Sequence, residues 1–103
     1  MKIAVTVDGD NADAAVSAGF AESPFFALVD AKTLECRFVR NKGNGEPGKI
    51  AGLKAIKQLH QEPVSLILTG EMKPAIHSTC RQMGIRVYMN ITGTLKEILK
   101  ELK

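Results

Sequence analysis

The sequence has 103 residues, of which 45% are hydrophobic and 24% are charged, as expected for one globular domain spanning residues 1–103. The net charge is only +3, the basic residues are scattered, and aromatic residues are few, so we expect no nucleic-acid partner. No segment approaches the ~20 apolar residues of a spanning helix, and the first residues are too short an apolar run for a signal peptide. We therefore expect a cytoplasmic protein without a membrane partner.

The first predicted element is a strand over Lys2–Val7, which is β-branched and apolar. Neither of its faces is strongly polar, which indicates a strand covered on both sides, at the centre of a sheet. The turn residues Asp8 and Gly9 follow it directly. Because ligands of α/β sheets bind at the carboxyl ends of central strands, we expect these two residues to border the binding crevice.

A long connection, residues 8–24, comes next and has no firm pattern of its own. A connection of this length in so small a domain is usually functional or mobile. Phe20 is its single large apolar side chain. Two interpretations stay open: Phe20 holds the loop to the core, or it forms the wall of a pocket.

Two strands then form a predicted hairpin, over Phe25–Asp30 and Glu35–Asn41. The second alternates strictly, so we expect it to be half-exposed and to lie towards a sheet edge. Its predicted outward face consists of Glu35, Arg37, Val39 and Asn41.

The second half of the chain alternates helices with strands. A glycine-rich loop over Lys42–Gly48 leads into a helix over Lys49–Gln61, followed by a buried strand over Val64–Leu68. The expected core stripe of that helix consists of Ile50, Leu53, Ile56 and Leu59. Further predicted elements are a helix that starts at Pro74 and ends at Gly84, a strand over Ile85–Met89, and a last helix that starts with a capping box at Thr94.

This order of elements predicts an α/β fold. The first three strands form an antiparallel meander, and crossover helices make the last two parallel. Both conditions are met by a five-stranded mixed sheet in the order 3-2-1-4-5, with helices on both faces, the three-layer α/β/α arrangement of ribonuclease-H-like folds. Asp8-Gly9 and Thr69-Gly70 then meet at the switch point between neighbouring strands, and we expect a shallow, basic crevice there.

Two catalytic motifs are incomplete. Gly43-x-x-x-x-Gly48-Lys49 has the spacing of a phosphate loop, but Ile50 replaces the hydroxyl residue that would hold magnesium, and Pro47 lacks an N–H donor. A weaker anion site at Gly48 and Lys49 remains.

Asp8 and Glu71 follow adjacent central strands, as metal-binding carboxylates do in ribonuclease-H-like nucleases. The first helix, Lys49–Gln61, contains no acidic residue to complete such a metal site. His60 and His77 have no ligand spacing, and no nucleophile–base set is visible. We assign no catalytic residues and expect a protein that is not an enzyme.

The chain is similar, along nearly all of its length, to the dinitrogenase iron–molybdenum cofactor biosynthesis family, the small NifX-type domains. No single motif is specific, but the ordered set is. The set consists of Lys2-Ile3-Ala4-Val5 with Asp8-Gly9, Val16-Ser17 with Phe20, Ser23-Pro24-Phe25-Phe26, Val29-Asp30, the glycine-rich start of the first helix, Thr69-Gly70, Gly84-Ile85-x-Val87-Tyr88 and Gly93-Thr94.

The resemblance implies a carrier or accessory protein that binds an iron–sulfur or iron–molybdenum cluster precursor, an anion, and works with cluster-assembly proteins. A basic, glycine-lined crevice suits such a cargo. The residues expected to contact it are Asp8, Gly9, Phe20, Gly48, Lys49, Thr69, Gly70, Glu71 and Met72.

The sequence departs from the family pattern at one position. The family typically reads Ser-x-His-Phe-Gly in the long loop, whereas this chain has Gly19 in place of that histidine and Ala21 in place of the last glycine. Glycine has no side chain to bind a metal, so the metal ligands stay unassigned; the soft alternatives are Met72, His77 and Cys36. The alternative function is a metal-free module that binds a small anion or a protein.

Overall fold

The computed structural model describes residues 1–103 and contains five strands and three helices. The strands are β1 (Lys2–Val7), β2 (Phe25–Asp30), β3 (Cys36–Arg40), β4 (Leu66–Leu68) and β5 (Arg86–Tyr88). The helices are α1 (Gly48–Gln61), α2 (Pro74–Gln82) and α3 (Leu95–Glu101). None of the helices is both long and apolar enough to span a membrane.

The strands form one mixed sheet in the order β3-β2-β1-β4-β5. β1 pairs antiparallel with β2 and parallel with β4, and β5 continues the parallel half. The predicted strand order and directions are confirmed. β1 is central because it pairs on both of its edges, and all of its residues from Ile3 to Val7 are buried.

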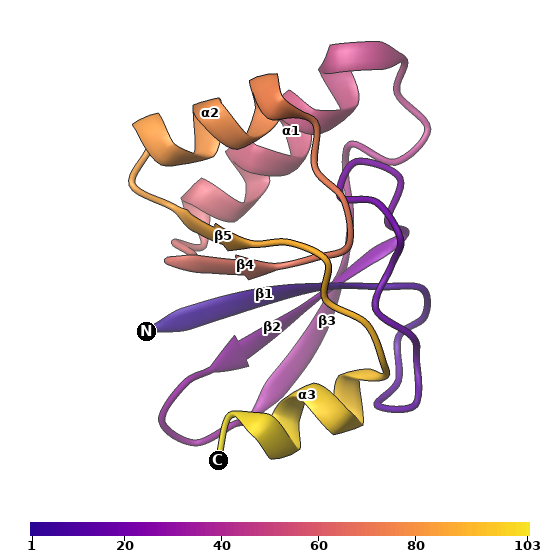
Figure 1. Cartoon of the computed structure of the whole chain (residues 1–103), viewed down its shortest axis with the longest axis vertical. Helices are drawn as coiled ribbons and strands as arrows, with labels where there is room; N and C mark the ends of the chain where they lie inside the picture. Colours follow the sequence, from indigo (N-terminus) through magenta and orange to yellow (C-terminus); the bar gives the residue numbers. More distant parts are fainter.

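Helices cover both faces of the sheet: α1 and α2 lie on one face and α3 on the other (Figure 1). The two sides of β1 therefore belong to two separate cores. Ala4 packs under α1 and α2 in a cluster of 13 buried residues, whereas Ile3, Val5 and Val7 pack with Leu95 of α3 in a cluster of 9. This double burial explains why β1 carries almost no polar side chains.

The starts of α2 and α3 follow from local sequence, as predicted. Pro74 occupies the first turn of α2, where its missing N–H costs nothing. At α3 the Thr94 hydroxyl accepts from the Glu97 N–H, and the Glu97 carboxylate accepts from the Thr94 N–H, which is a complete capping box.

The predicted core stripe of α1 is partly wrong. Ile56 and Leu59 are buried, but Ile50 and Leu53 are each 49% exposed. Small residues take their place on the inward face, where Gly52 lies so close to Ile76 of α2 that a Cβ at position 52 would come 2.6 Å from the Ile76 Cδ1 atom. The close contact between the two helices decides which face of α1 turns inward, and this contact is not visible in the hydrophobic spacing.

Asn41 is a second correction. Its predicted outward position at the end of the alternating strand would expose it, yet its side chain is 4% exposed. The strand ends at Arg40, and Asn41 turns into the core, where its amide bonds the neighbouring loop.

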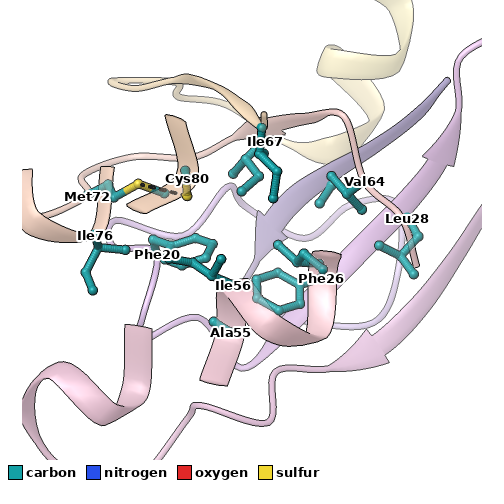
Figure 2. Close-up of a cluster of buried hydrophobic side chains, with 13 residues drawn as sticks. Phe20, Phe26, Leu28, Ala55, Ile56, Val64, Ile67, Met72, Ile76 and Cys80 are labelled. Carbon is teal, nitrogen blue, oxygen red and sulfur yellow. Dashed lines mark hydrogen bonds between the residues drawn. The ribbon is translucent and has the colours of Figure 1, made fainter. Parts of the chain in front are cut away.

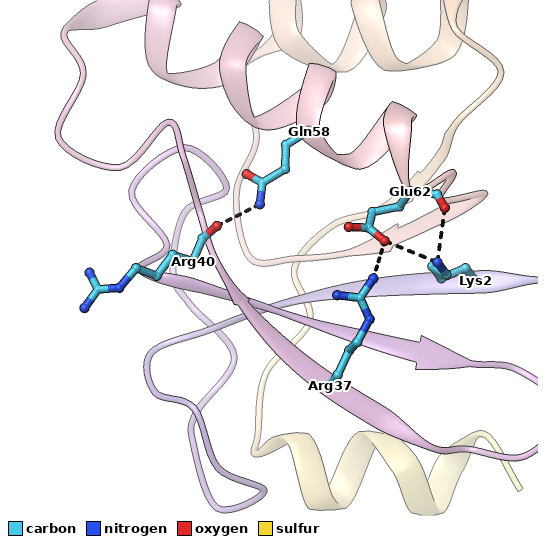
Figure 3. Close-up of polar contacts among 5 residues, drawn as sticks. All are labelled: Lys2, Arg37, Arg40, Gln58 and Glu62. Atoms are coloured by element: carbon cyan, nitrogen blue, oxygen red, sulfur yellow. Dashed lines mark hydrogen bonds and ion pairs between the residues drawn. The ribbon is translucent and has the colours of Figure 1, made fainter.

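An ion-pair cluster ties the start of β1 to the end of α1. The carboxylate of Glu62 accepts hydrogen bonds from Lys2, at 3.2 Å, and from Arg37 of β3 (Figure 3). All three side chains are partly exposed, so this cluster contributes little to stability at physiological salt. It lies at the amino end of β1, away from the carboxyl ends of the parallel strands.

A short segment, Val16–Phe20, crosses the gap between the carboxyl ends of β1 and β4, and we call it the strap. The strap N–H of Ser17 donates to the Thr6 carbonyl at 2.9 Å, and its carbonyl accepts from the Gly70 N–H at 3.2 Å. The backbone continues this pairing on the Glu71 side, where Gly19 bridges Glu71 in parallel. The switch point of the sheet is therefore filled by the protein's own main chain.

Candidate functional site

A cavity of about 550 Å³ lies beside the strap, where α1 and α2 begin. Its volume is within the range of ligand pockets. The lining comes from four segments that are distant in sequence, and Figure 1 shows the start of both helices near the long purple loop. The lining residues are Gly19–Glu22, Asn44–Glu46, Gly48, Lys49, Ala51, Gly52, Glu71–Ile76, Met89 and Asn90.

Two helix N-termini border this cavity. The N-cap residues are Pro47 for α1 and Lys73 for α2, and neither makes a side-chain capping bond. Neither helix has an acidic residue in its first turn. The first amide groups of a helix have no partner within it and carry its positive end, so both helices present free donors at one place.

The loop before α1 and the first residue of α1 contain glycines in the left-handed region, with φ of +91° at Gly45 and +54° at Gly48. A side chain would strain either residue. The sequence pattern of a glycine-rich turn that opens a helix thus gives the local geometry expected of an anion site.

The ionisable lining of the cavity is mixed. Lys49 and Lys73 contribute cations, whereas Glu22, Glu46 and Glu71 contribute carboxylates. Glu46 is paired with Lys54 outside the lining, at 2.8 Å. With two cations and three carboxylates in the lining, the expectation of a basic crevice is wrong for the side-chain charges. The positive groups that remain are the N-termini of the two helices.

The floor of the cavity is apolar and contains sulfur. Phe20 is 1% exposed and its ring packs at a tilt against Phe26, with 5.8 Å between the ring centroids, so it both anchors the strap in the core and forms a wall of the cavity. Next to it the Cys80 thiol donates to the Met72 sulfur at 4.0 Å (Figure 2). Burial raises the pKa of the Cys80 thiol to about 11, so it is a neutral thiol at physiological pH.

Two buried amides hold the loops that form the cavity walls. The Asn41 side chain donates to the Ser23 carbonyl at 2.8 Å and accepts from the Gly43 N–H at 2.8 Å, which links the loop after the strap to the loop before α1. Gln58 of α1 donates to the Arg40 carbonyl at 2.7 Å (Figure 3). Neither amide was identified from the sequence, because an isolated Asn or Gln gives no pattern.

Five of the nine predicted contact residues line the cavity, and four do not. Those that line it are Phe20, Gly48, Lys49, Glu71 and Met72. The other four lie at the switch point that the strap fills. Thr69 is fully buried and bonds Thr6 at 2.8 Å, Gly70 lies against the strap carbonyls, and Asp8 accepts from Ser17 at 2.6 Å, with Gly9 beside it.

The soft ligands considered from the sequence are scattered. Only Met72 borders the cavity; His77 lines a separate hollow beside β5, and Cys36 packs on the α3 side of the sheet. No group of three or more His, Cys, Asp or Glu side chains in the structure is arranged to hold a metal ion.

The sequence did not identify the N-terminus of α2 as part of the site. Lys73, Pro74 and Ala75 all line the cavity, and the Lys73-Pro74 pair had already identified the start of a helix. The sequence pattern did not show that the two helix N-termini lie next to each other. A parallel β4 directs its following loop to the same rim as the loop before α1, so both helix starts meet there.

The comparison with protein families gives one match, to the family described as dinitrogenase iron-molybdenum cofactor, over residues 1–103. The chain belongs to this family. No curated protein matches the sequence.

Three solved structures have the same fold. The apo form of the orange protein from Desulfovibrio gigas is 27% identical, with a TM-score of 0.89 over 97% of this chain and 84% of that one. A putative NifB protein from Thermotoga is 22% identical, with a TM-score of 0.80 over 96% and 84% of the two chains. A putative dinitrogenase from Methanocaldococcus jannaschii is 18% identical, with a TM-score of 0.65 over 99% and 90%.

Gly19, the position where the family pattern has histidine, borders the cavity of this family member. The nearest neighbours of a Cβ at Gly19 would be the carboxylate atoms of Glu22, which occupy that space. The backbone at Gly19 is not in the left-handed region, so a larger residue fits once Glu22 moves aside.

Proposed function

We propose that this protein is a non-enzymatic accessory protein that carries an iron–sulfur or iron–molybdenum cluster precursor in the cavity where α1 and α2 begin. One observation carries the proposal: two helices without acidic first turns start at a single cavity, in a chain of the iron-molybdenum cofactor family. Such precursors are anions, and free amide groups at helix N-termini bind anions.

The absence of strong metal ligands in the lining favours a cargo that keeps its own ligands. The lining contains neither cysteine nor histidine, and thiolate and imidazole are the usual protein ligands of iron. A cluster that retains its sulfide ligands would be held by hydrogen bonds, by Lys49 and Lys73, and by contact with Met72. Binding of this kind is reversible without breaking a metal–protein bond, which suits a carrier.

The similarity to the orange protein also supports the carrier proposal. That protein is 27% identical to this chain and was solved in an apo form, the term for a protein without its bound group. Uptake of a bound group by a relative of the same fold is consistent with a carrier function here.

A metal-free module is the second candidate, because Gly19 provides no ligand and the lining charges are mixed. In this alternative the cavity binds a small oxyanion at the two helix ends. The two candidates share the anion site and differ in whether iron is retained.

The deciding experiment mixes the purified protein with an iron–sulfur cluster donor under anaerobic conditions, followed by desalting, iron determination and visible absorption. We expect iron to be retained by the wild type and to be lost in the presence of excess inorganic phosphate. If no iron is retained while phosphate alone shifts the amide resonances of Lys49 and Ala75, the metal-free module is correct.

Gly19→His tests the family difference directly. The imidazole enters the cavity beside the strap, so we expect the variant to retain more iron than the wild type. Gly19→Ala is the matched control, because it displaces the Glu22 carboxylate in the same way without adding a ligand. Equal iron retention by the two variants would show that position 19 does not contact the cargo.

A further inference from the structure

The outward face of α1 carries apolar side chains that do not pack into the core of this chain. Ile50 and Leu53 lie about one turn apart, and each leaves 49% of its surface in water. Lys49, Lys54 and Lys57 surround them and are exposed. Half-exposed branched aliphatic side chains on a helix rim are common singly, but here two are adjacent and ringed by cations.

Charge is segregated across the molecule. Neither α1 nor α2 contains an acidic residue. Together with the N-cap residue Lys73, these two helices carry five of the 14 basic side chains, whereas the rest of the chain carries more acidic than basic residues. The positive net charge of the protein therefore comes entirely from the layer that covers one face of the sheet.

Intramolecular pairing does not neutralise this surface. Of the three lysines on the outward face of α1, only Lys54 forms an ion pair, with Glu46 at 2.8 Å. Lys49 and Lys57 make none. The face thus combines an apolar centre with unpaired cations at its edge, which is the arrangement of an interface core with a polar rim.

We propose that the outward face of α1 docks a protein partner that presents an acidic surface with a central apolar side chain. Carboxylates of the partner pair with Lys49 and Lys57 while its apolar group covers Ile50 and Leu53. A second copy of this chain is a poorer occupant of the same face, because a two-fold contact would place the lysines of both copies against one another. Two aliphatic side chains on a folded helix are also too small an area to insert into a lipid surface.

The position of this face relates it to the proposed cargo. Lys49 lines the cavity and also lies at the edge of the docking face, so a partner on α1 reaches the cavity rim. The docking itself does not depend on the proposed function, since the face is present without cargo. It is therefore measured on the cargo-free protein, and its failure is distinct from a failure to retain iron.

The test uses three synthetic peptides of equal length, titrated into the ¹⁵N-labelled protein. The first alternates glutamate with leucine, the second replaces leucine with serine, and the third replaces glutamate with lysine. We expect the first peptide to shift the amides of α1 selectively, the second to bind about tenfold more weakly, and the third not to bind.

Matched variants locate the contact. Leu53→Ser and Lys57→Glu should each weaken the first peptide by about tenfold, because one removes the apolar contact and the other reverses a rim charge. Tyr88→Ser, at another exposed side chain, and Lys100→Glu, on α3, should leave its affinity unchanged.

Four outcomes would overturn the proposal. Equal binding of the first two peptides would mean charge attraction alone, and shifts spread over the whole surface would mean no defined face. A concentration-dependent dimer abolished by Leu53→Ser would assign the face to a second copy. Tighter binding to anionic phosphatidylglycerol vesicles than to the first peptide would assign it to a membrane surface.

Discussion

Gly70 shows how closely the strap packs against the sheet. A Cβ at Gly70 would lie 2.6 Å from the Ser17 carbonyl oxygen and closer still to that of Ala18, both of them backbone atoms that cannot move alone. We expect Gly70→Ala to lower the free energy of unfolding by about 1–3 kcal/mol, the usual cost of forcing an extra methyl group into packed structure. Urea unfolding measures this change.

Gly9→Ala is the control for that substitution. Gly9 also follows a central strand, but its Cβ would come no closer than 3.4 Å to any neighbour, and its backbone is not left-handed. We expect a change within about 0.5 kcal/mol. Equal destabilisation by the two variants would mean that the strap does not lie against Gly70 in solution.

Asn41 is the residue on which both cavity walls depend. Removing its side chain in Asn41→Ala leaves the Ser23 carbonyl and the Gly43 N–H without their buried partner. We expect a loss of about 1–3 kcal/mol in the free energy of unfolding, together with weaker anion binding at the cavity. Asn44→Ala, at an exposed residue of the same wall, should change stability little; a similar loss there would show that the wall, not the buried amide, is sensitive.

At the scale of elements, a substitution at the start of α2 should have opposite effects on stability and on anion binding. Ala75 lies in the first turn of α2, is exposed and borders the cavity. A carboxylate there interacts favourably with the helix end, so Ala75→Glu should raise the free energy of unfolding by about 0.3–1 kcal/mol. The same carboxylate occupies the place of the anion, so iron or phosphate binding should fall.

For Ala75→Glu, the free energy of unfolding measured with urea should rise while the amount of retained iron falls. Ser78→Glu adds the same charge to the exposed side of α2 outside the lining, and we expect it to leave binding unchanged. If both variants weaken binding equally, long-range charge rather than the helix end is responsible.

The elements themselves could be predicted from local pattern. The two apolar faces of Lys2–Val7, the Pro74 start of α2 and the capping box at Thr94 each act within a few residues, and each appears in the structure as expected. The inward face of α1 could not be predicted. It depends on the contact between Gly52 and Ile76, two residues that only the folded chain brings together.

The candidate site was predictable only in part, for the same reason. Gly48 and Lys49 follow from a glycine-rich turn before a helix, and Phe20 from being the one large apolar residue in a long loop. Whether the switch point is open or filled depends on two backbone hydrogen bonds of Ser17, which donates to Thr6 and accepts from Gly70, and these join segments distant in sequence. No local pattern specifies such a crossing.

For the whole molecule, the buried Cys80 thiol and the partly buried Cys36 thiol predict a loss of stability in alkali. Burial raises the pKa of Cys80 to about 11 from a usual value of 9.0, and raises that of Cys36 as well. Between these two pH values the unfolded chain releases the Cys80 proton while the folded chain keeps it. The unfolded state then binds fewer protons, so the free energy of unfolding falls as pH rises through this window.

Cys80→Ala tests that contribution. The variant should be less stable than the wild type at pH 7, because the methyl group fills less of the core, yet its stability should fall less steeply between pH 9.0 and 11. Urea unfolding at several pH values gives both quantities. Parallel pH profiles for variant and wild type would contradict an elevated pKa of the Cys80 thiol.

The strap is attached at each edge through peptide groups; the Ala18 methyl group takes no part in that attachment, and Gly19 has no side chain. The backbone of the strap can therefore stay the same while single substitutions change the side chains that it carries. Descendants of one ancestral domain could acquire or lose affinity for a given metal centre at position 19 without rebuilding the sheet beneath. Differences in cargo among such proteins should accordingly be sought along this stretch before they are sought in the strands.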